Sequence, residues 1–225
     1  MTRRTNGVIA GIAYFLYIAV AYPSMLLSNR ATSGEGMAAK LATMASHASD
    51  VRIAAVLSLI GCFCALVLAV TLYAITREQD RDLALLGLTC RVAEGITGAA
   101  GIPVTLGLLA IATATGTDAP DPGAARAVGA FVLGPSWFIA ATFFAVGSAL
   151  FSWLLLRGRM VPVWLAGLGV IASAVVAVAL PLQATEVLTG LVTRLMWLPV
   201  AVFELVLAGW LIVKGASPAR AMPVR

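Results

Sequence analysis

Hydrophobic residues occur along this chain in six long runs, separated by short segments that hold most of the charge. The runs cover residues 7–27, 53–75, 83–112, 127–156, 163–183 and 195–213. A helix that crosses a hydrocarbon core of about 30 Å needs about 20 residues at a rise of ~1.5 Å per residue. The pattern therefore predicts an all-α integral membrane protein, a bundle of six transmembrane helices.

Two of these runs are longer than a membrane crossing requires. Residues 83–112 and 127–156 would each form about 45 Å of helix. Such helices must tilt, protrude or bend. Pro103 and the Gly134-Pro135 pair are the expected bending points, because proline removes a backbone donor and crowds the preceding turn.

The basic residues of the connectors predict the orientation in the membrane. One side would carry nine of them and the other side five, with Arg91 left inside the third run. By the positive-inside rule the richer side is cytoplasmic, which places both chain ends there. The nine are Arg3, Arg4, Arg77, Arg81, Arg157, Arg159, Lys214, Arg220 and Arg225, and the five are Arg30, Lys40, Arg52, Arg126 and Arg194.

The expected organisation is a single six-helix transmembrane domain over residues 1–215, followed by a short cytoplasmic tail, 216–225, without fixed structure. Arg3 and Arg4 before the first run are typical of a signal peptide. The first run is longer than the hydrophobic region of such peptides, so we expect it to be retained. The net charge of +5 does not indicate nucleic acid as a partner, since the basic residues are scattered through short connectors.

The longest connector, residues 28–50, leaves two structures open. Met37, Leu41 and Met44 recur at helical spacing and are compatible with a short amphipathic helix on the membrane surface or over a cavity. The favoured prediction is an ordinary surface loop that packs its few apolar residues against the bundle.

The third run contains charged residues that a membrane tolerates poorly. Gly87, Arg91, Glu94, Gly98 and Gly101 recur at alternating spacings of four and three, which places them on one helix face. The glycines allow another backbone to approach closely. The arginine and the glutamate must then point toward protein or a wet cavity.

A second intramembrane carboxyl, Glu204, occurs in the sixth run. Glu94 would lie about 16 Å and Glu204 about 14 Å from the same membrane side. If the two helices are neighbours, Arg91 meets both carboxyls. Two adjacent buried carboxylates do not both ionise readily, so one is expected to keep a proton that can serve as an acid or a coupling ion. Equally, a buried Arg-Glu pair can act only as a structural element that fixes helix register.

The sequence lacks soluble-enzyme motifs, and its other candidates are single residues inside the hydrophobic runs. The sequence contains no phosphate-binding glycine loop, HExxH or CxxC motif, and its single histidine, His47, makes metal binding improbable, so no metal or cofactor is expected. Polar, aromatic or small residues that are candidates for lining a substrate cavity are Tyr14, Tyr17, Gly98, Ser136, Thr142, Gln183 and Trp197.

Several short motifs occur in a characteristic order along the chain. They are Gly11-Ile12-Ala13-Tyr14, Leu72-Tyr73, Leu83-Ala84-Leu85-Leu86 with Arg91 and Glu94, and Glu204 with Trp210-Leu211-Ile212-Val213-Lys214-Gly215. Their order resembles the domain-of-unknown-function 4386 family of bacterial polytopic membrane proteins, over roughly residues 7–215. The resemblance implies a compact six-helix bundle in the bacterial cytoplasmic (inner) membrane, and supports Arg91, Glu94 and Glu204 as positions that matter. It implies no reaction.

Three functions remain open at this point. The leading hypothesis is an intramembrane enzyme that uses Glu94 or Glu204 as an acid on a lipophilic small molecule, in an isoprenoid cyclisation or isomerisation, with Arg91 holding the other carboxyl anionic. The alternatives are a small-solute or proton-coupled transporter and a noncatalytic scaffold or lipid-binding module. The expected partners are membrane lipids and a lipophilic ligand, and the sequence does not define the oligomeric state.

Overall fold

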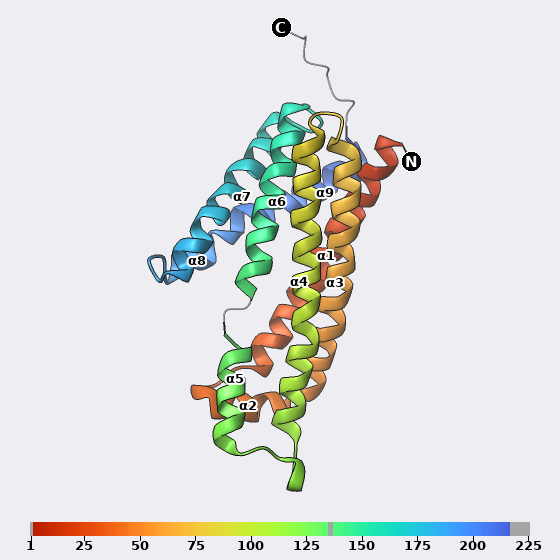
Figure 1. Ribbon diagram of the computed structural model, residues 1–225. Coiled ribbons are helices and arrows are strands. Elements are labelled where there is room, and N and C mark those ends of the chain that lie inside the picture. Colours follow the sequence, from red (N-terminus) through yellow and green to blue (C-terminus); the bar gives the residue numbers. More distant parts are fainter. Residues whose placement is uncertain (1, 135–136, 217–225) are drawn as a thin grey trace. The chain divides into compact units, whose positions relative to one another are not determined.

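The computed structural model describes residues 2–134 and 137–216, and Figure 1 shows its helices. Within these residues the chain forms helices and connections, with no β-strand. The elements are α1 (Arg3–Ala31), α2 (Gly36–Ser46), α3 (Ala48–Thr76), α4 (Arg81–Thr113), the 3-10 helix η1 (Gly116–Asp118), α5 (Pro122–Val132), α6 (Trp137–Arg157), α7 (Val163–Ala184), α8 (Leu191–Leu195) and α9 (Trp197–Val213).

Six stretches in the described part of the chain are long and apolar enough to cross a membrane. Each overlaps one of the predicted hydrophobic runs, so the prediction of an all-α protein with six such helices is confirmed. The side on which the termini lie stays a prediction. The stretches are Arg3–Ala31, Ala48–Thr76, Arg81–Thr113, Pro122–Arg157, Val163–Ala184 and Leu191–Val213.

The two longest runs behave differently. The third forms one helix, α4, which continues through Pro103. The fourth is divided: α5 ends at Val132 and α6 begins at Trp137. Gly134 lies outside both helices, at the predicted bending point, whereas Pro135 and Ser136 lie outside the described residues, as do positions 217–225 of the predicted tail.

Local signals explain where several helices begin. Asp80 precedes α4, and its Oδ1 accepts a hydrogen bond from the backbone N of Leu83 at 3.1 Å. Asp121 precedes α5 and accepts from the backbone N of Gly123 and Ala124 at 2.8 and 3.0 Å. Such side chains satisfy amide groups that have no partner inside the first turn of a helix.

The prediction of a surface loop between the first two spans is wrong. Residues Gly36–Ser46 form the helix α2, with Leu41 and Met44 buried. α2 lies beside α5 (Figure 1), where Met37 and Leu41 contact the position of Gly129. The apolar face of α2 is therefore buried against another helix of the chain.

The chain falls into two compact units. Unit 1 comprises Met1–Leu16, Phe63–Gly95 and Phe138–Arg225, and unit 2 comprises Tyr17–Cys62 and Ile96–Trp137. Helices α1, α3 and α4 contribute residues to both units, and so does α6, whose first residue, Trp137, belongs to unit 2. The single domain over residues 1–215 stays a prediction.

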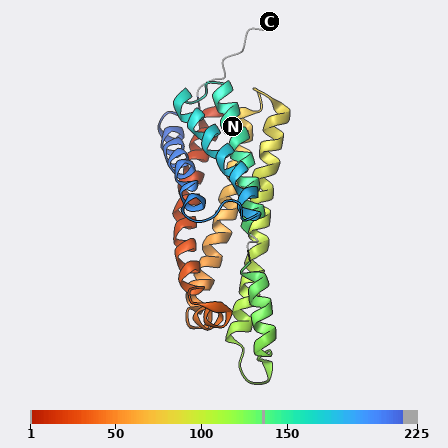
Figure 2. The same cartoon turned by 90° about the vertical axis from the view of Figure 1, so that its left-hand side faces the viewer.

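Unit 1 is organised around helices α6, α7 and α9, with α7 packed against α9 (Figures 1 and 2). The beginning of α1 approaches α9 closely: a Cβ added to Gly11 would lie 2.7 Å from the carbonyl oxygen of Ala208. Only glycine permits this contact between backbones. Fully buried core side chains of unit 1 include Leu68, Leu72, Ile75, Phe151, Leu154, Leu155, Leu165, Phe203, Leu207 and Leu211.

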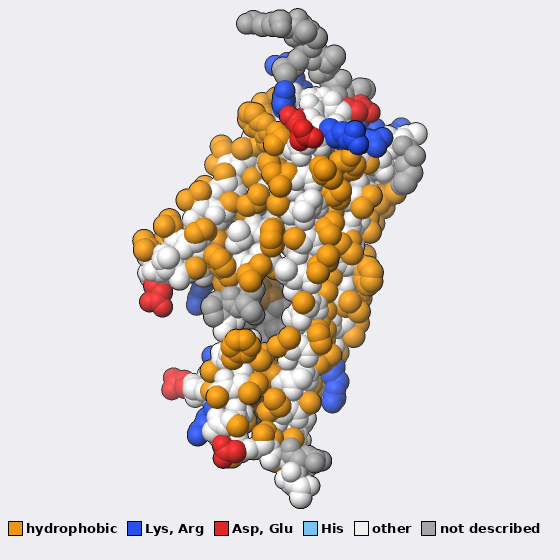
Figure 3. Space-filling view, in the orientation of Figure 1, with side chains coloured by type: hydrophobic (Ala, Val, Ile, Leu, Met, Phe, Trp, Pro, Cys, Tyr) orange, Lys and Arg blue, Asp and Glu red, His pale blue; other side chains and the backbone are white. Residues whose placement is uncertain are grey.

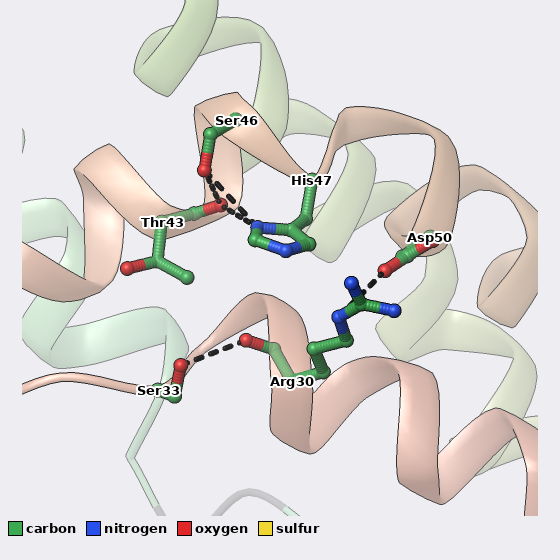
Figure 4. Close-up of polar contacts among 6 residues, drawn as sticks. All are labelled: Arg30, Ser33, Thr43, Ser46, His47 and Asp50. Carbon is green, nitrogen blue, oxygen red and sulfur yellow. Dashed lines mark hydrogen bonds and ion pairs between the residues drawn. The ribbon is translucent and has the colours of Figure 1, made fainter.

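Unit 2 has a smaller core and a polar cluster at the ends of its helices. Arg30, at the end of α1, forms an ion pair with Asp50 of α3, at 3.8 Å (Figure 4). His47 follows α2, and its Nδ1 lies 3.0 Å from Ser46 Oγ and 3.1 Å from the carbonyl oxygen of Thr43. The buried apolar core of unit 2 includes Ala31, Leu41, Met44, Val51, Leu108 and Leu109.

Candidate functional site

Arg91 and Glu94, which lie on one face of α4, form a buried ion pair in unit 1. The distance between Arg91 Nη1 and Glu94 Oε2 is 2.9 Å, and the two side chains are 0% and 7% exposed. The spacing of three residues on a helix brings such side chains together. Because water does not solvate these buried groups, the charge of each must be compensated by the opposite charge of its partner.

Helix α6 shapes the space that Arg91 occupies. Nη1 of Arg91 donates a hydrogen bond to Ser148 Oγ at 3.4 Å, and the guanidinium carbon lies 4.8 Å from the ring centroid of Phe144. Between them, a Cβ added to Gly147 would lie 3.0 Å from Arg91 Cγ. The three residues share one face of α6, so the missing side chain at position 147 gives room for the arginine stem.

The second carboxyl, Glu204 on α9, joins this pair. Glu204 is 4% exposed and interacts electrostatically with both Arg91 and Glu94. Its Oε1 is buried and has no hydrogen-bond partner within the described part of the chain. The structure thus brings together Arg91, Glu94 and Glu204, the three charged residues inside the third and sixth hydrophobic runs.

Tyr14 of α1 completes the cluster. Its side chain is 2% exposed and interacts electrostatically with Glu204, Arg91 and Glu94. The contact between Gly11 and Ala208 explains the placement, because Tyr14 lies one turn beyond Gly11 and Glu204 one turn before Ala208 on antiparallel helices. We name Tyr14, Arg91, Glu94 and Glu204 the buried cluster.

The other predicted cavity residues are distributed more widely. Trp197 packs on Phe144 in unit 1, with the ring centroids 6.1 Å apart. Thr142 donates its hydroxyl to the carbonyl oxygen of Phe138 in its own helix, at 2.8 Å. Gln183 has a buried Oε1 without a hydrogen-bond partner among the described atoms, near the end of α7.

Tyr17 and Gly98 belong to unit 2. Ser136 lies outside the described residues. No group of three histidine, cysteine, aspartate or glutamate residues suited to a metal ion occurs in residues 2–134 and 137–216.

Sequence reasoning missed the contribution of α6. Phe144, Gly147 and Ser148 hold Arg91, yet none of them was a candidate. The available signal was the pair of small residues, Gly147 and Ser148, inside a strongly apolar helix, since small residues mark helix–helix contacts in membranes. The sequence does not say which of the other helices they face.

Six long apolar helices define a multi-pass α-helical membrane protein. The chain matches the family described as "Domain of unknown function (DUF4386)" over residues 9–215. It belongs to this family, as the motif order indicated. No curated protein and no solved structure matches the chain.

Proposed function

We propose that this protein is an intramembrane enzyme that protonates a lipophilic small molecule, with Glu204 as the acid. The observation that supports the proposal is the buried Oε1 of Glu204, which has no hydrogen-bond partner among the described residues although it lies beside a charged pair. A buried polar atom without a partner is costly unless a ligand or water completes it.

The charge balance of the buried cluster supports an acid at this position. Arg91 supplies one positive charge, and Glu94 is bound to it at 2.9 Å. Full ionisation of Glu204 as well would leave a net negative charge in a medium of low dielectric constant. One proton on Glu204 makes the cluster neutral, and that proton is available to a ligand.

The reaction that fits this arrangement is an acid-initiated isomerisation or cyclisation of an isoprenoid. Glu204 transfers its proton to one carbon of a double bond, and the other carbon becomes a carbocation. In a cyclisation, a second double bond attacks this carbocation, forms a carbon–carbon bond and moves the positive charge to another carbon. In both reactions, loss of a proton from a carbon next to the cation then forms a new double bond, and this proton returns to the Glu204 carboxylate. No redox partner is required. The aromatic rings of Tyr14 and Trp197 are suited to stabilise the cationic intermediate.

Proton-coupled transport would use the same proton, but the connections between the spans do not favour it. Transporters of this size are commonly built from two inverted halves. The first and second spans are joined through the helix α2, whereas the fourth and fifth are joined by a tight turn between Arg157 and Val163. The two halves therefore do not share a pattern of connections.

Two measurements test the proposal. Infrared spectra of the purified protein at neutral pH should contain the carbonyl band of a protonated carboxylic acid, and Glu204→Gln should remove it. Incubation with farnesol, geranylgeraniol and squalene, followed by gas chromatography and mass spectrometry, should yield a cyclised or isomerised product. Glu35→Gln, which changes an exposed glutamate before α2, is the matched control and should retain both signals. Undiminished product formation by Glu204→Gln would refute the assignment.

We also propose that the protein lies in the cytoplasmic membrane of a bacterium with its N-terminal end inside. The support is the excess of basic residues at one set of helix ends. A cysteine introduced at Thr2 should react with a membrane-impermeant maleimide only after the cells are broken, whereas one at Ser33 should react in intact cells. The reverse result would invert the orientation.

A further inference from the structure

The ends of six helices meet at one end of unit 1 and carry many basic residues. The turn between α3 and α4 contacts two other helices, because Arg3 of α1 pairs with Glu78 and Arg157 of α6 pairs with Asp80. Gly7 of α1 lies against Gly215 and Ala216, which follow α9. Figure 3 shows charged side chains of both signs gathered at this end, above a mostly hydrophobic face.

Five basic residues at this end have no carboxylate within ion-pair distance among the residues that the structure describes. Three acidic residues lie at this end: Glu78 binds Arg3, Asp80 binds Arg157, and Asp82, in the first turn of α4, forms no ion pair with the described residues. Each of the five is exposed to solvent. They are Arg4, Arg77, Arg81, Arg159 and Lys214, which we name the basic rim.

Exposed tryptophans lie next to the basic rim on the hairpin of α6 and α7. Trp153 is 46% exposed and precedes Arg157 by one helical turn, and Trp164 is 63% exposed in the first turn of α7. Tryptophan prefers the level of the lipid headgroups and glycerol, where its ring is in an apolar environment and its N–H is hydrated. The basic rim therefore lies at the depth of the phosphate groups.

We propose that the basic rim is a binding site for the phosphate group of anionic phospholipids. Guanidinium groups donate paired hydrogen bonds to phosphate oxygens, and a partner of opposite charge would balance the unpaired cations. A membrane lipid is favoured over free phosphate because the rim adjoins the apolar face of Trp164 and Val163, which are 63% and 57% exposed. Acyl chains cover such a surface, whereas an inorganic ion does not.

The test compares lipids that differ in headgroup charge. The purified protein in neutral detergent is mixed with equal amounts of dioleoyl phosphatidylglycerol and dioleoyl phosphatidylcholine, and bound lipid is counted by native mass spectrometry. We expect the wild type to retain phosphatidylglycerol preferentially. The triple variant Arg77→Gln, Arg81→Gln, Arg159→Gly should bind it about a hundredfold more weakly, since each cation near an anionic surface contributes roughly fivefold.

The matched control removes the same charge elsewhere. Arg52, Arg126 and Arg194 are exposed and lie outside the basic rim, and their replacement by glutamine should change phosphatidylglycerol affinity by less than about threefold. Unchanged binding by the rim variant, or an equal loss in both variants, would overturn the proposal.

Potassium phosphate distinguishes the two sources of phosphate. If it displaces the lipid no better than potassium chloride of equal ionic strength, the site is specific for the phospholipid. Stronger displacement by phosphate would show an anion site without lipid specificity and would also overturn the proposal. The result is independent of the buried cluster, because none of its four residues belongs to the rim.

Discussion

The guanidinium of Arg91 lies over the ring of Phe144, with 4.8 Å between Cζ and the ring centroid. Phe144 is in turn supported by Trp197, whose ring centroid is 6.1 Å away at an interplanar angle of 39°. Arg91 is fully buried, so one face of its guanidinium group contacts an aromatic ring instead of water. A desolvated contact of this kind contributes about 2 kcal/mol.

Replacing the ring tests that contribution. Phe144→Leu keeps an apolar side chain under Arg91 but removes the π face, and we expect the free energy of unfolding to fall by about 2 kcal/mol. Unfolding by sodium dodecyl sulfate in mixed micelles measures the change. Phe63→Leu alters a side chain that is 61% exposed and should shift stability by no more than ~0.5 kcal/mol. Equal effects of the two substitutions would show that the aromatic contact is unimportant.

Gly147 gives a steric test of the same pocket. An alanine Cβ would lie 3.0 Å from Arg91 Cγ and 3.1 Å from Cδ, so Gly147→Ala should push the arginine stem and destabilise the protein by about 1–3 kcal/mol.

Gly167 provides the matched control, because a Cβ added there meets no atom within 4 Å. Gly167→Ala should not destabilise the protein, since alanine is the better helix former. The same micelle unfolding assay compares the two. A Gly147→Ala variant as stable as Gly167→Ala would mean that Arg91 has more freedom than its contacts indicate.

The ion pair itself can be examined with a double-mutant cycle. Arg91→Met leaves Glu94 without its cation at 2.9 Å, and we expect a loss of about 3–5 kcal/mol, because an uncompensated buried charge remains. Arg91→Met combined with Glu94→Gln removes both charges and should recover most of that loss. Additive losses in the double variant would instead indicate that the two side chains stabilise the fold separately.

The six spans could be predicted because the membrane imposes a simple rule on the sequence. Backbone groups in hydrocarbon must be satisfied within the helix, so each span requires a long uninterrupted apolar run. The intramembrane charges were visible for the same reason: Arg91, Glu94 and Glu204 interrupt such runs. We could expect these three side chains to meet because they lie at similar depth in the membrane and because each buried charge needs a partner of opposite charge.

What could not be predicted depends on contacts between distant segments. Helix α2 has only three regularly spaced large apolar residues, and its partner α5 lies far along the chain. The local sequence pattern in this segment therefore did not distinguish a helix from a loop. Likewise Phe144 and Gly147 are ordinary residues of an apolar helix, and only the packing of α6 on α4 gives them a role in holding Arg91.

The turn between α6 and α7 offers a prediction in which stability and lipid binding move in opposite directions. Arg159 has a φ of 49°, a left-handed conformation that costs a residue with a side chain about 1–2 kcal/mol. The backbone N of Met160 bonds to the carbonyl oxygen of Leu155 at 3.0 Å across this turn, which fixes the conformation at the end of α6. Arg159→Gly should therefore stabilise the protein by about 1 kcal/mol.

The same substitution removes one cation of the basic rim, so phosphatidylglycerol should bind roughly fivefold more weakly to the more stable variant. Thermal unfolding in detergent and native mass spectrometry of one preparation measure both effects. Arg159→Ala serves as the control, because it removes the charge but keeps the left-handed strain, and it should weaken lipid binding without raising stability. If Arg159→Gly gained stability and kept its affinity for phosphatidylglycerol, the turn would be a structural feature without a part in lipid binding.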